Sequence, residues 1–345
     1  MASLVKVTKE GRLFLKVGGA FFGLFFIIYL FVKGGSLIQT VFFPKPPPLP
    51  EEALGKLPHI AFPSVGTPGL EFKINTIDGE LPVLPDRVNV YKLLQPEPNL
   101  LALESAKNIL GRQNFVENQI KISDTLYQWT QSISGITIRY DIVTKNYVIA
   151  SNYLFNPNLT SQSQLPSEDY IKSDIHGFIG SISEKTDNLD LEKTKIEYLE
   201  LQNGILVPAE NLGKSRFARI SIQQKEVDKI PIINDVPNES VLTFLVSYPE
   251  SGIRVLEGQF INQEPNMDAK SDYPIKTAAQ AIEDLKKGNA YMINPQNLSR
   301  VDVTNVELKY YLNKNSFDFL MPVIIVTGIN FTGYVEAIPS TSLSN

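Results

Sequence analysis

The chain contains no cysteine, and this absence removes several kinds of chemistry. Without thiols there is no disulfide, no cysteine-ligated zinc, no dithiol redox pair and no thiol nucleophile. Exported domains commonly use disulfides, so a chain that lacks them must be held together by its core alone. With 43% apolar and 20% charged residues, the composition is that of an ordinary globular protein with such a core.

Histidine is almost as scarce, with His59 and His176 as its two occurrences. A zinc site needs three or four convergent ligands, and an Asp-x-His pair such as Asp174 and His176 most often lies on a solvated helix face. The acidic stretch 187–192 lacks the glycine that an EF-hand loop needs at its sixth position, so a charged turn is the better interpretation. We therefore expect no metal and no cofactor.

Local catalytic motifs are also missing. The sequence contains no G-x-S-x-G, H-E-x-x-H or Walker pattern, so we expect that the protein is not an enzyme. A pair of carboxylates that cleaves glycosidic bonds leaves no sequence signature, because the two acids are close in space and not in the chain. A hydrolase of cell-envelope polymers therefore stays an alternative.

Positive charge is concentrated in the first sixteen residues. The chain has a net charge of −5, and Lys6, Lys9, Arg12 and Lys16 against Glu10 give this part +3, which leaves −8 for the rest. A chain of this charge is attracted neither to nucleic acid nor to an anionic membrane surface. We therefore expect no nucleic-acid partner.

One long apolar run is present, at residues 13–32, and its charge-free part is 17–32. A membrane-spanning helix needs about 20 apolar residues, and Lys16 can snorkel to the interface so that the run extends back to Leu13. The run therefore predicts a transmembrane helix over residues 13–33 that contacts the lipid bilayer.

The charges that flank this run predict its orientation. Cationic flanks stay on the cytoplasmic side, so residues 1–12 are expected to be a cytoplasmic tail and the part after the helix extracytoplasmic. A cleaved signal peptide is the alternative, since Gly34, Gly35 and Ser36 are small enough for a cleavage site. The run is longer than a usual signal-peptide core and no A-x-A pattern follows it, so the membrane anchor is favoured.

Proline-rich sequence follows the predicted anchor. Residues 44–50 (PKPPPLP) favour polyproline II, a stiff spacer, and we predict a linker over 34–66. The remaining chain is long enough to bury one large core or several smaller ones. We divide it into a first α+β unit (67–160), a middle β-rich unit (161–265) and a C-terminal α+β unit (266–345).

Hydrophobic periodicity predicts helices that alternate with antiparallel strands. In the first unit, residues 71–75 and 87–94 are expected as strands around the turn-like Asp78-Gly79, followed by a helix that ends at Gly111. In the middle unit, Asn203-Gly204 between apolar runs is a strong signal for a type I′ hairpin.

The C-terminal unit has the clearest pattern. Thr277 and Gln280 predict a capping box, and Ala281, Ile282 and Leu285 a buried stripe on the helix that follows. Alternation predicts three strands after this helix, over 303–312, 317–327 and 333–338. Residues 99–153 show the same order of helix, strand and hairpin, which favours an α+β fold with two or more divergent copies of this unit.

The only tryptophan, Trp129, alternates with Tyr127 on one predicted strand. If exposed, the two rings would form a possible interaction platform for a ligand; if buried, they belong to the core. Large aromatic residues are more often buried, so the core is the favoured interpretation.

Short motifs surround the C-terminal helix. Tyr273-Pro274-Ile275 leads into residues 278–288 (AAQAIEDLKKG), and VELKYY at 306–311 and LMPV at 320–323 follow. Together with an N-terminal anchor, this pattern resembles the YycH/YycI family of sensor-kinase accessory proteins and, more loosely, PepSY-type domains. The resemblance lies mainly over residues 273–323. It implies a regulator that acts by contact, and it implies no catalytic residues.

These features favour a single-pass membrane-anchored protein whose extracytoplasmic part binds or regulates another membrane or envelope protein by contact. Besides the hydrolase, a structural subunit of an envelope assembly is an alternative, which would expose a large apolar patch. Nothing in the sequence indicates the oligomeric state.

Overall fold

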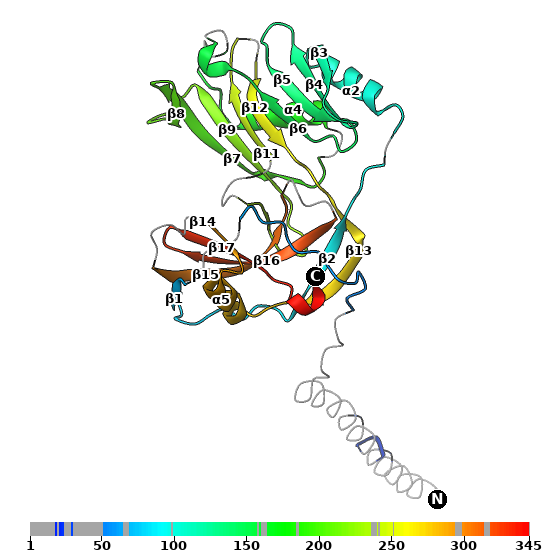
Figure 1. Ribbon diagram of the computed structural model, residues 1–345, viewed down its shortest axis with the longest axis vertical. Helices are drawn as coiled ribbons and strands as arrows, with labels where there is room; N and C mark the ends of the chain where they lie inside the picture. The colour runs from blue at the N-terminus through cyan, green and yellow to red at the C-terminus, as the bar shows by residue number, and fades with distance from the viewer. Residues whose placement is uncertain are drawn as a thin grey trace, which may run out of the picture. The chain divides into compact units, whose positions relative to one another are not determined.

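The computed structural model, drawn in Figure 1, describes residues 51–345 other than 65–68, 98, 157–158, 160–163, 184–185, 236–239, 241, 251, 294–298, 314–317 and 345, and also Gly18, Phe21, Phe22, Gly23 and Tyr29. The chain divides into two units, Met1–Leu49 and Pro50–Asn345. The predicted transmembrane helix lies outside the described residues apart from those five positions, and so do the predicted tail and the proline run. No helix among the described residues is long and apolar enough to cross a membrane.

The unit Pro50–Asn345 is an α+β fold made mainly of antiparallel strands, as the sequence predicts. One of its two sheets has nine strands, all paired in the antiparallel sense (Figure 1). Their order across the sheet is β3 (Phe115–Lys121), β4 (Leu126–Gln131), β5 (Thr137–Asp141), β6 (Tyr147–Ala150), β12 (Arg254–Phe260), β11 (Leu242–Ser247), β9 (Phe217–Gln224), β7 (Leu189–Gln202) and β8 (Ile205–Pro208).

Two helices, α2 (Ala102–Gly111) and α4 (Glu168–Ile182), share a core with this sheet. The helix α4 has an isoleucine stripe at helical spacing, and all four side chains are almost fully buried: Ile171, Ile175, Ile179 and Ile182. They pack against inward residues of the strands, such as Ile138, Tyr140 and Phe244. Burial of this stripe stabilises a helix whose two glycines lower its intrinsic propensity.

The other sheet has eight strands. Its main path is β1 (Glu71–Ile74), β15 (Arg300–Tyr311), β16 (Phe319–Gly328), β17 (Phe331–Glu336) and β14 (Tyr291–Ile293). The short β10 (Ile232–Ile233) pairs with β15, and β2 (Arg87–Leu93) pairs with both β16 and β13 (Pro265–Pro274). Helix α5 (Ala278–Lys287) shares the larger core of this sheet.

The predicted features of α5 are confirmed. Thr277 and Gln280 form a capping box, and the residue that ends the helix, Gly288, has a left-handed φ of 79°. The stripe Ala281, Ile282 and Leu285 is buried. The predicted hairpin at Asn203-Gly204 is also present, because β7 and β8 pair there and both residues have positive φ.

Two local expectations were wrong. The strands β1 and β2 form close to the expected residues but do not pair with each other: β1 pairs in parallel with β15, from Glu71 opposite Arg300, and β2 pairs with β13. These pairings join strands that are far apart in the sequence, and a local turn signal does not indicate such partners. Helix α2 ends at Gly111 as expected, but Gly111 is itself helical and is not a left-handed C′ glycine; Asn114 takes the positive φ, of 61°.

Strand pairing joins residues from different predicted units. Strand β6 of the expected first unit pairs with β12 of the expected middle unit, and β2 of the first unit pairs with β13, which lies almost wholly in the expected C-terminal unit. Residues 51–64, expected as linker, belong to the unit Pro50–Asn345, and Leu57 there is completely buried.

Candidate functional site

A cavity of about 400 Å³ lies along α4, and we call it the α4 cleft. Its lining comes from α4 itself, the turn after α2, and strands β4 and β12 with their flanking residues. The lining residues are Gln113, Asn114, Phe115, Gln131, Ile136, Asp174, Gly177, Phe178, Ser181, Ile253, Arg254 and Val255. Amide, hydroxyl and charged groups therefore surround an apolar floor, the composition typical of a small ligand or side-chain site.

Helical spacing brings one face of α4 to the cleft. Asp174, Gly177, Phe178 and Ser181 are three or four residues apart, so they lie on one side of the helix, away from the isoleucine stripe. A Cβ atom added at Gly177 would meet no atom within 4 Å, so the glycine leaves the cleft open beside the helix backbone.

Hydrogen bonds from side chains hold Gln113, Gln131 and Ser181, the polar wall of the cleft, in place. Gln131 Nε2 donates to the carbonyl oxygen of Gln113 at 2.9 Å, and Gln113 Nε2 donates to Ser181 Oγ at 2.9 Å. Ser181 in turn donates to the Phe178 carbonyl at 2.7 Å. The wall is thus preorganised before any ligand arrives, which reduces the entropy lost on binding.

The cleft contains one anion and one cation among its described lining residues, Asp174 and Arg254. The buried Tyr248 hydroxyl lies beside Asp174: burial raises the pKa of Tyr248, and the negative charge of Asp174 raises it further. Tyr248 therefore stays neutral at physiological pH and can orient the carboxylate.

A second cavity, of about 520 Å³, lies beside residues 51–62, which we call the strap. The strap is attached to the folded unit along its length. Glu51 N–H donates to Asp272 at 2.8 Å, and Leu57 forms a parallel β-bridge with Leu343. Phe62 packs on three tyrosine rings, Tyr291, Tyr311 and Tyr334, at centroid distances of 5.9, 5.2 and 6.5 Å.

The cavity, here called the strap pocket, contains one ion pair, Lys276–Asp284, and a contact between His59 and Glu336. Glu336 accepts a hydrogen bond from Ile60 N–H at 2.5 Å and contacts His59 Nδ1 at 2.9 Å. Lys276, just before α5, contacts Asp284 in the last turns of that helix at 2.9 Å. All of these residues line the pocket. Its charged groups come from four separate segments of the chain, so no local motif could have indicated them.

The two aromatic residues named from the sequence lie in the core. Tyr127 is 8% exposed and Trp129 is 2% exposed, and their rings are 5.8 Å apart in a stacked arrangement. They point toward the buried side chains shared with α2 and α4. An exposed platform is therefore not formed, because the helices cover that face of β4.

Neither histidine belongs to a metal centre among the described residues, where no group of three or more His, Asp or Glu side chains is placed to hold an ion. His176 is half-buried on α4, and its Nε2 lies 3.5 Å from Thr194 Oγ1. Burial lowers the pKa of His176, and the charge of Lys172 lowers it further. The histidine is therefore mainly neutral at pH 7.

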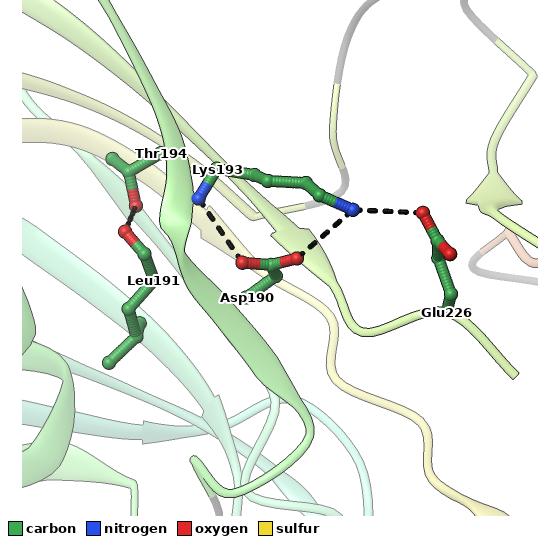
Figure 2. Close-up of polar contacts among 5 residues, drawn as sticks. All are labelled: Asp190, Leu191, Lys193, Thr194 and Glu226. Carbon is green, nitrogen blue, oxygen red and sulfur yellow. Dashed lines mark hydrogen bonds and ion pairs between the residues drawn. The ribbon is translucent and has the colours of Figure 1, made fainter. Parts of the chain in front are cut away.

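The acidic stretch 187–192, expected as a charged turn, is a turn only at residues 187–188, and residues 189–192 begin strand β7. Figure 2 shows Lys193 Nζ between two carboxylates, 3.4 Å from Asp190 and 2.8 Å from Glu226. Lys193 N–H also donates to Asp190 at 3.1 Å, and Thr194 Oγ1 donates to the Leu191 carbonyl at 2.8 Å. The lysine thus supplies the positive charge that a calcium ion would bring.

A glycoside hydrolase needs two acidic side chains that face one cleft. Asp284 and Glu336 share the strap pocket, where Asp284 pairs with the Lys276 ammonium and Glu336 is bonded to His59 and to Ile60 N–H. The pKa of Glu257 is raised by burial, with Arg219 acting in the opposite direction. Glu257 is largely exposed, so solvent weakens this effect, and it lines neither cavity.

Sequence reasoning did not identify the α4 cleft. Its lining residues lie between 113 and 255, and only their tertiary arrangement brings them together. The available signal was the pair Gly177 and Gly180, which is unusual inside an amphipathic helix and marks the open side of α4.

No protein-family model matches the chain, and a search of curated proteins finds no match. Among solved structures the chain is similar to YycH from Bacillus subtilis, at 11% sequence identity and a TM-score of 0.35. That match covers 79% of this chain and 56% of YycH, so the chain spans about half the length of YycH. It is also similar to the YpeB C-terminal domain from Bacillus megaterium, at 13% identity and a TM-score of 0.28, over 72% of this chain and 96% of that domain.

The structure comparison thus finds the resemblance to YycH that the motifs of the C-terminal unit indicate. Identity and TM-score are both low, so the similarity assigns no function to this chain.

Proposed function

We propose that this chain is a single-pass membrane-anchored protein whose extracytoplasmic part binds another envelope protein and regulates it by contact. The observation that carries the proposal is the α4 cleft, with its preorganised polar wall and apolar floor. A side chain of the partner would insert beside Gly177, and the amides of Gln113 and Gln131 would orient it.

The chemistry of the cleft suits recognition. Amide side chains offer donors and acceptors together, and one charge of each sign fixes the orientation of what is bound. Cleavage of a glycosidic bond needs two acids about 5–10 Å apart, and Asp174 is the one carboxylate in the described lining of this cleft.

The sheets also favour binding through a cleft over binding by strand addition. An exposed edge strand can pair with another chain, and proteins prevent this with short, bulged or proline-containing edges. The edge strand β3 has two register shifts against β4, and β8 is four residues long and ends at Pro208. The strands at the two ends of the main path of the eight-stranded sheet, β1 and β14, have four and three residues, and β13, which pairs with β2, has a register shift and a proline at each end.

Membrane attachment rests on the sequence: the apolar run 13–32, its cationic flank and the proline-rich spacer. Protease added to intact spheroplasts is expected to remove residues 34–345 and leave a small membrane-bound fragment. A protected C-terminus would overturn the orientation and the extracytoplasmic location.

The test of the cleft compares two glycines on one helix. Gly177→Leu places a leucine in the α4 cleft, whereas Gly180→Leu places one on the same helix outside the cleft lining. Neither added Cβ meets an atom within 4 Å, and both changes raise helix propensity, so stability should move in the same direction in both variants.

Crosslinking and pull-down from intact membranes then provide the readout. We expect one stoichiometric envelope partner with the wild-type chain and with Gly180→Leu, and its loss with Gly177→Leu. Equal recovery of the partner with both variants would overturn the role of the cleft. Recovery of many copies of the chain itself would instead support a structural subunit.

A further inference from the structure

The strap pocket has no lining residue in common with the α4 cleft, and its chemistry is different. We propose that it is a second binding site, which takes a cationic side chain, a primary ammonium or a guanidinium, from a peptide. The inference does not depend on the α4 cleft, because the residues that carry it lie in the strap, around α5 and near the C-terminus.

The charges of the pocket favour a cation. Glu336 and Asp284 are both lining residues, and their side chains are only 17% and 21% exposed. The ammonium of Lys276 is the one permanent positive charge among the described lining residues, and His59, which contacts Glu336, carries a charge only when it is protonated. Partly buried charges are screened less than surface charges, so the excess negative charge acts strongly on a group that enters the pocket.

The C-terminal end of helix α5 adds to the negative electrostatic potential of the pocket. Asn289 and Ala290, which follow the C-cap residue Gly288, line the pocket, so the C-terminal end of α5 faces it. A helix carries about half a negative charge at its C-terminus, and cations are stabilised there. The sequence after residue 16 has a net charge of −8, which would also attract a basic peptide over a longer range.

The shape of the pocket fits a long basic side chain. Its volume of about 520 Å³ exceeds what an ammonium group alone would fill. Ile60, Phe62, Ala290 and Leu343 supply an apolar wall beside the charged groups. Lysine and arginine combine an apolar stem with a charged head, so the stem would lie on this wall while the head reaches the carboxylates.

Lys276 shows how the cation would be held. Its ammonium already contacts Asp284 at 2.9 Å, so the protein itself places this type of group in the pocket. A ligand ammonium would compete with Lys276 for Asp284 and would also reach Glu336. Removal of the lysine charge should therefore strengthen binding, an effect that a misfolded variant would not produce.

The experiment uses the full chain in detergent micelles and isothermal titration calorimetry. The probes are acetyl-Leu-Lys-Leu-amide, acetyl-Leu-Arg-Leu-amide, the uncharged acetyl-Leu-norleucine-Leu-amide, and cadaverine. We expect saturable binding of the two basic peptides and at least about tenfold weaker binding of the norleucine peptide, since a charged hydrogen bond contributes about 1.5–3 kcal/mol and 1.4 kcal/mol is tenfold. Cadaverine bound as tightly as the lysine peptide would overturn the assignment to a peptide.

Three variants complete the test. Asp284→Asn should weaken binding of the lysine peptide about tenfold, by the same conversion. Lys276→Met should tighten it several-fold. Glu283→Gln is the matched control, because Glu283 lies on the same helix, pairs with Lys286 at 2.7 Å and does not line the pocket. Weaker or unchanged binding in Lys276→Met, or equal binding of the lysine and norleucine peptides, would overturn the proposal.

Discussion

The hydroxyl of Tyr91 donates a 2.5 Å hydrogen bond to the carboxylate of Asp228, and Asn89 Nδ2 donates to the same oxygen at 2.7 Å. Asp228 and Lys229 both have positive φ, in a tight turn closed by a bridge between Val227 and Ile230. The turn thus fastens the segment after β9 to strand β2, in the core of the eight-stranded sheet.

Removal of this carboxylate should destabilise the fold. In Asp228→Ala the part-buried Tyr91 hydroxyl loses its acceptor, and we expect a loss of about 1–3 kcal/mol in the free energy of unfolding. Denaturant melts of the full chain measure this loss. Tyr91→Phe should lower the free energy of unfolding less in the Asp228→Ala variant than in the wild-type chain, because the hydrogen bond is already absent there. Lys229→Ala is the control, because it places an alanine at the neighbouring positive-φ position. Equal losses in the two single variants would point to backbone strain instead of the hydrogen bonds.

The packing of α5 gives a second prediction. Leu285 is completely buried, and Lys287 two residues later is exposed. Leu285→Ala should cost about 2–5 kcal/mol, the usual range for a leucine in a core. Lys287→Ala should change the free energy of unfolding by less than about 0.5 kcal/mol. Denaturant melts of both variants measure the two changes in the free energy of unfolding. Losses of similar size would contradict the burial of Leu285 in the stripe of α5.

A third prediction concerns the glycine on which Leu285 packs. A Cβ atom added at Gly333 would lie 2.6 Å from Leu285 Cδ2, closer than real Cβ atoms approach, and 3.2 Å from the Phe331 ring, a tight contact. Gly333→Ala should therefore destabilise the wild-type chain. In the Leu285→Ala background the clash with Cδ2 is gone, so the same change should cost less. Additive losses would show that Leu285 and Gly333 are not in contact.

Acid should release the start of the strap. The pKa of Asp272 is lowered, first by the hydrogen bond from Glu51 N–H and then by Arg87, which lies 2.9 Å away. Because the folded-state pKa is below the ordinary value of 3.8, this contribution is fully present above 3.8 and is lost as the pH falls through the folded-state value.

Hydrogen exchange, corrected for its intrinsic pH dependence, measures this release in residues 51–57. At neutral pH, Asp272→Asn should speed exchange there, whereas Asp268→Asn, at an exposed position on the same strand, should not. Slow exchange of the strap well below the folded-state pKa would contradict a role for the Asp272 charge.

The half-buried His176 should make stability depend on pH. Its folded-state pKa is below 6.5, mainly because of burial, so its contribution is present above pH 6.5 and decreases as the pH falls through the folded-state value. We expect the free energy of unfolding to fall from pH 7.5 toward pH 5, and His176→Gln to flatten this slope. An unchanged slope in the variant would assign the effect to other groups.

Local sequence signals predicted the elements that depend on neighbouring residues. The capping box of Thr277 and Gln280 and the left-handed Gly288 require only residues within one helix, and both are present. The Asn203-Gly204 hairpin likewise depends on the positive φ that these two residues tolerate. Hydrophobic periodicity identified which face of each such element is buried.

Tertiary structure decided what each buried face meets, because a pattern of period 2 or 3.6 does not specify its partner. Glu71 pairs with Arg300 and Tyr147 with Phe260, and no local signal distinguishes these partners from nearer ones. The tertiary structure also decided where the candidate sites lie, because local patterns do not specify which residues meet. Trp129 and Tyr127 are core residues because α2 and α4 cover them, and the α4 cleft exists because a turn, two strands and one helix converge on Gly177. Such convergence arises from contacts between distant residues, whose free energy depends on the whole packed fold.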